Sequence, residues 1–75
     1  MNAPKLVKMA NQIADNFSYG DEEKAVAGVL DHVTRFWTLD MKQQIIAHQR
    51  EGNTGLNDVA AAAITALASN ETYAA

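Results

Sequence analysis

Apolar side chains recur every three to four residues along most of the chain, and no segment alternates apolar and polar residues. A spacing of three to four residues places side chains on one face of an α-helix, whereas a period of two places them on one face of a strand. Leu6, Met9, Ile13 and Phe17 form the first such stripe, which Val7, Ala10 and Ala14 widen. The pattern therefore predicts an all-α fold.

Residues that favour helix starts divide the pattern into four segments. The predicted helices span residues 3–18, 22–37, 39–50 and 58–68. Asn2, Asp21, Thr38 and Asn57 stand at or just before the starts of these segments. Their side-chain oxygens can accept hydrogen bonds from the N–H groups that a helix start leaves free, so we expect these four residues to be N-caps.

We expect one domain over residues 1–69, a small bundle of three main helices plus a short fourth C-terminal helix. Residues 70–75 carry no helical pattern and are predicted to be a flexible tail. Gly20 and Gly52 fit the ends of the first and third helices. The alanine run at 60–63 favours helix and leaves room for the close approach of another backbone.

Size makes the core of such a domain marginal. The chain has 75 residues, and a chain of about that size buries only about 60–65% of the surface that it exposes when unfolded. Disulfides stabilise many small domains, but the chain has no cysteine. The sequence therefore predicts that association with another chain contributes to stability.

Composition argues against several classes of function. The net charge of −3 gives no basic face for nucleic acid, and no segment approaches the length of a membrane span. The N-terminal segment lacks the layout of a secretory signal, so we expect a cytoplasmic protein. With no cysteine and two histidines, no metal or cofactor site is expected in this chain.

No catalytic constellation is apparent either. Neither histidine has an obvious serine partner, and no glycine-rich phosphate loop occurs. The adjacent Glu22 and Glu23 suit the positive end of a helix dipole. An acyl carrier needs an exposed serine at a helix start, but Ser18 and Ser69 stand at a helix end and in the tail. The chain is expected not to be an enzyme.

The segment DHVTRFWTLDM (residues 31–41) raises the main question, because it places an arginine beside two aromatic residues. Tryptophan and arginine are enriched at binding hot spots, but a tryptophan is also a natural core residue. Either aromatic residue could therefore pack inside or contact a partner. A wider candidate set adds two neighbouring amides and a histidine. The candidate partner-interface residues are Arg35, Phe36, Trp37, Asn11, Gln12 and His48.

Three segments together resemble the delta-subunit family of soluble NAD-dependent formate dehydrogenases. They are MANQIADNF (9–17), DHVTRFWTLDM (31–41) and HQREGNTGL (48–56), in the order and approximate spacing of the family. In the second segment the residues in register are His32, Arg35, Phe36, Trp37 and Met41. The chain departs from the family pattern at Leu39 and Asp40, where the family often has Pro and Arg, and at Asp58, where it often has Pro.

The resemblance implies a non-catalytic accessory subunit in a complex that oxidises formate and reduces NAD. The larger subunits of that complex would be the partners and would carry the molybdopterin (molybdenum or tungsten), iron–sulfur clusters and FMN. An alternative class is a free-standing helical interaction module, forming a homodimer through its apolar edges and the alanine-rich fourth helix.

Overall fold

The computed structural model describes residues 3–17, 20–52 and 55–69, and all regular structure in these segments is helical. The helices are α1 (Ala3–Phe17), α2 (Glu22–Phe36), α3 (Leu39–Arg50) and α4 (Asp58–Ala68). The predicted all-α class and the order of four helices are confirmed. The predicted end of the first helix, its Asn2 cap and the predicted tail lie outside the described residues.

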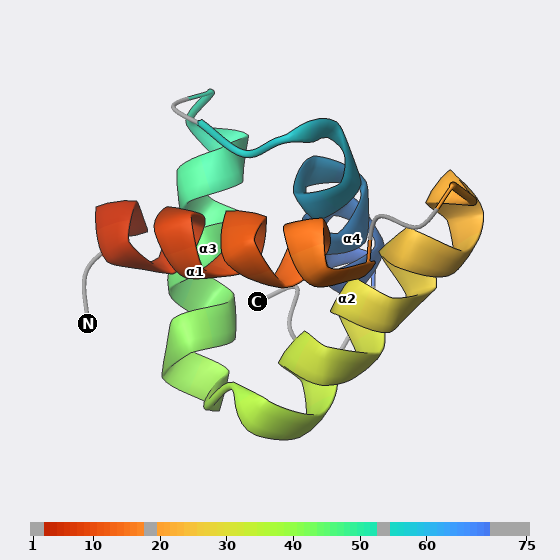
Figure 1. The fold of residues 1–75 in the computed structure, drawn as a ribbon. Coiled ribbons are helices and arrows are strands. Elements are labelled where there is room, and N and C mark those ends of the chain that lie inside the picture. Colours follow the sequence, from red (N-terminus) through yellow and green to blue (C-terminus); the bar gives the residue numbers. More distant parts are fainter. Residues whose placement is uncertain (1–2, 18–19, 53–54, 70–75) are drawn as a thin grey trace.

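The helices pack around a centre that α1 and α4 share. α1 contacts each of the other three helices, and so does α4, which has its most extensive contact with α2. In Figure 1, α1 (red to orange) runs across the front of α3 (green), and α2 (orange-yellow to yellow-green) descends from the right of the view towards its lower centre. α2 and α3 are therefore held in place largely through their contacts with α1 and α4.

The three caps that the described segments contain form as predicted. The Asp21 carboxylate accepts hydrogen bonds from two backbone N–H groups of the first turn of α2, at 3.0 and 3.4 Å. The Thr38 hydroxyl accepts one at 3.2 Å at the start of α3, and the Asn57 amide accepts one at 2.8 Å at the start of α4. Gly20 and Gly52, predicted after helix ends, have φ of 93° and 82°, where glycine is favoured.

α1 is rotated so that Ala10 and Ala14, predicted to widen the apolar stripe, lie at its centre. Leu6 is fully buried, but its companions in the core are Ala10 and Ala14. Met9 and Ile13 lie at the edge of the core, and Phe17 is 37% exposed. Interhelical distance depends on the side chains at the contact, so methyl groups at its centre allow close packing while larger side chains flank it.

α4 contributes as much to the core as any longer helix. It has 11 residues, and Ala60, Ala63, Ile64 and Leu67 are buried. Its small residues do allow close packing, as predicted, but the contact is made within the chain. The face of α4 that carries Ala60 and Ala63 is thus not available to a second copy, which removes one of the surfaces expected for a homodimer.

Candidate partner interface

The two neighbouring aromatic residues at the end of α2 have opposite environments. Trp37 is 5% exposed and belongs to the hydrophobic core, whereas Phe36 is 70% exposed. α2 ends at Phe36, and Trp37 continues with extended backbone at φ −87° and ψ 142°. Trp37 is therefore a core residue, with almost no surface to offer a partner. We remove it from the candidate interface on that ground.

The exposed apolar surface gathers where α2 meets α3. Phe36 and Leu39, at 70% and 52%, have the largest exposed fractions among the described large hydrophobic residues. The Phe36 ring lies 4.9 Å from the half-buried imidazole of His32, centroid to centroid, at an interplanar angle of 46°. We call the surface formed by His32, Arg35, Phe36 and Leu39 the α2–α3 corner.

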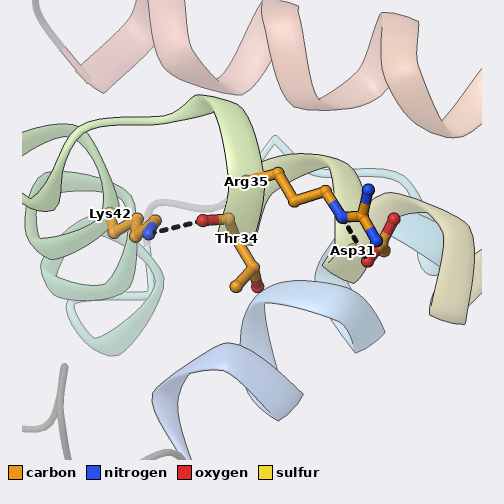
Figure 2. Close-up of polar contacts among 4 residues, drawn as sticks. All are labelled: Asp31, Thr34, Arg35 and Lys42. Atoms are coloured by element: carbon orange, nitrogen blue, oxygen red, sulfur yellow. Dashed lines mark hydrogen bonds and ion pairs between the residues drawn. The ribbon is translucent and has the colours of Figure 1, made fainter.

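Charged side chains around this corner have partners within the chain. Arg35 Nε donates to Asp31 Oδ1 at 3.1 Å, one turn earlier on α2 (Figure 2). Gln44 Nε2 donates to Asp40 Oδ2 at 2.7 Å on α3. Both side chains of the Arg35–Asp31 pair are mostly exposed, so the pair adds only about 0.2–1 kcal/mol to stability. Its effect on the corner is to place a negative charge beside the arginine.

A buried lysine fixes the geometry of the corner. Lys42 is 7% exposed, and its Nζ donates to the backbone oxygen of Thr34 at 2.9 Å (Figure 2). Thr34 lies in the last turn of α2, where carbonyl groups lack intrahelical partners and where a cation is favoured by the helix dipole. Lys42 thus joins the start of α3 to the end of α2. Sequence reasoning did not single it out, although it shares a helix face with Ile45 and Ile46.

Replacing Lys42 with methionine tests this contact while retaining an unbranched, largely apolar side chain. We expect Lys42→Met to lower the free energy of unfolding by about 1–2 kcal/mol, because the carbonyl of Thr34 loses a charged donor. Lys8→Met, at an exposed position of α1, is the matched control for the change in net charge and should change stability by less than about 0.5 kcal/mol. Urea denaturation measures both. Equal effects would contradict a specific role for Lys42.

The candidate residue Asn11 makes its contacts inside the chain. Its Nδ2 donates to the backbone oxygen of Gly55 at 3.0 Å, and its Oδ1 accepts from the backbone N–H of Asn57 at 2.8 Å. The side chain of Asn57 also donates to the backbone oxygen of Asn11, at 3.5 Å. These amide-to-backbone contacts lie within the chain, and they fasten the segment before α4 to α1.

The remaining candidates lie apart from the corner. Gln12 is exposed on α1, and His48 is half-buried in the last turn of α3. His48 follows Leu39 by nine positions, or about 13 Å along a helix axis. The structure places the Phe36 ring against His32. Arg35 and Leu39, which are close to Phe36 in sequence, are exposed.

An open hollow of about 390 Å³ lies at the other end of α2. Four carboxylates line it, those of Asp15, Asp21, Glu22 and Asp58. Three of them stand at helix starts, where a negative charge is favourable, so their positions follow from the helices themselves. Across the described segments, no group of three or more His, Cys, Asp or Glu side chains could hold a metal ion.

In the part of the chain that the structure describes, every helix is too short or too polar to cross a membrane. The fold and its surface define a small all-α protein whose most exposed large apolar residues among those described, Phe36 and Leu39, stand on either side of the junction between α2 and α3. Residues 5–64 match the family of the NADH-dependent formate dehydrogenase delta subunit, FdsD. The chain belongs to this family, which confirms the resemblance seen in the three sequence segments. Comparisons with curated proteins and with solved structures gave no match.

Proposed function

We propose that this chain is a non-catalytic accessory subunit of a cytoplasmic NAD-dependent formate dehydrogenase, and that it aids the assembly or stability of the larger subunits. The observation that carries the proposal is the family match over residues 5–64, which covers most of α1, all of α2 and α3, and more than half of α4. The family description names a delta subunit, which is by definition one part of a larger enzyme.

In this proposal the chemistry takes place on the larger subunits. Formate is oxidised to carbon dioxide there, and electrons pass through molybdopterin, iron–sulfur clusters and FMN to NAD. This chain contributes a surface that contacts the larger subunits. Arg35 and Phe36 are exposed and close together, which supports a contact role for them, whereas Gln12 and His48 would contact the complex at separate places.

Docking would also benefit the small chain. A domain of this size buries a modest share of its surface when it folds alone. A partner that binds only the folded form shifts the folding equilibrium towards that form. In the same way, the assembled or cofactor-loaded state of the larger subunits would be stabilised if the chain binds that state.

The test is to produce the larger subunits with and without this chain and to purify both preparations. Formate-dependent NAD reduction, cofactor content and the half-life of activity on warming are then measured. We expect the preparation without the chain to show lower cofactor content or a shorter half-life, and restoration when the chain is co-produced. Identical yield, cofactor content, activity and half-life would contradict an accessory role.

A further inference from the structure

We draw no further inference here: the strongest candidate, the exposed apolar surface patch that holds Phe36 and Leu39 at the junction of α2 and α3, carries none because nothing in the structure shows what covers it.

Discussion

Replacing Trp37 with alanine is expected to lower the free energy of unfolding by about 3–5 kcal/mol, the usual cost of truncating a buried aromatic side chain. Trp37 is 5% exposed and packs in the core cluster. A domain of 75 residues has a total stability of about 4–11 kcal/mol. The loss is therefore a large share of the total, and a substantial part of the variant should be unfolded at 37 °C.

The adjacent residue supplies the control for this prediction. Phe36→Ala removes a ring that is 70% exposed, so stability should change by less than about 0.5 kcal/mol. Urea denaturation followed by circular dichroism measures both variants without depending on tryptophan fluorescence. Similar losses at the two positions would show that the environments assigned to Trp37 and Phe36 are wrong.

Replacing Asn11 with alanine is expected to lower the free energy of unfolding by about 2 kcal/mol. The substitution removes the Asn11 Nδ2 group that donates to the backbone oxygen of Gly55. It also removes the Oδ1 atom that accepts from the backbone N–H of Asn57. Each lost bond leaves a backbone group without this partner. Of the bonds between α1 and the segment before α4 that are described above, the one from the Asn57 side chain to the backbone oxygen of Asn11, at 3.5 Å, then remains. The N–H of Asn57 in particular lies in a part-buried contact, where an unsatisfied group is costly.

Gln12→Ala is the matched control, since Gln12 is the next residue along α1 and is exposed. Its effect on stability should stay below about 0.5 kcal/mol. If Asn11→Ala is as stable as the wild type but binds the larger subunits less tightly, then Asn11 acts at an interface and the intramolecular contact is unimportant. Urea denaturation, which measures stability, and a binding titration of the full chain against the larger subunits distinguish these results.

Features set by neighbouring residues were predictable from the sequence. Asp21, Thr38 and Asn57 each cap the helix that follows, through groups two or three residues on, so that local signals suffice. The starts of α2, α3 and α4 follow from the same residues. The stop of α2 was misplaced by one residue, because Trp37 continues the apolar spacing of Val33 although its backbone has already left the helix.

Features that depend on packing between distant segments were not predictable. Asn11 meets residues that lie 44 and 46 positions further along the chain, and no local pattern marks that contact. The rotation of α1 towards Ala10 and Ala14 depends on how closely its neighbours approach, which the size of Met9 and Ile13 alone does not reveal. Lys42 is buried because a carbonyl of another helix receives it.

The sequence also left open which aromatic residue faces outward. Both readings of the segment at 31–41 were retained, and the structure separates them, with Trp37 inside and Phe36 outside. The family of the chain can be inferred from the sequence, through three segments that are weak singly and specific together. The family match then covered all of the second segment and most of the chain.

The most direct test of the central claim is affinity purification of the tagged full chain from its own cells. The eluate is analysed by native mass spectrometry and assayed for formate-dependent NAD reduction. The account predicts a stable complex that contains iron–sulfur and flavin subunits and has this activity. Recovery of the chain alone or as a homodimer, while the activity elutes elsewhere in an intact enzyme, would contradict it.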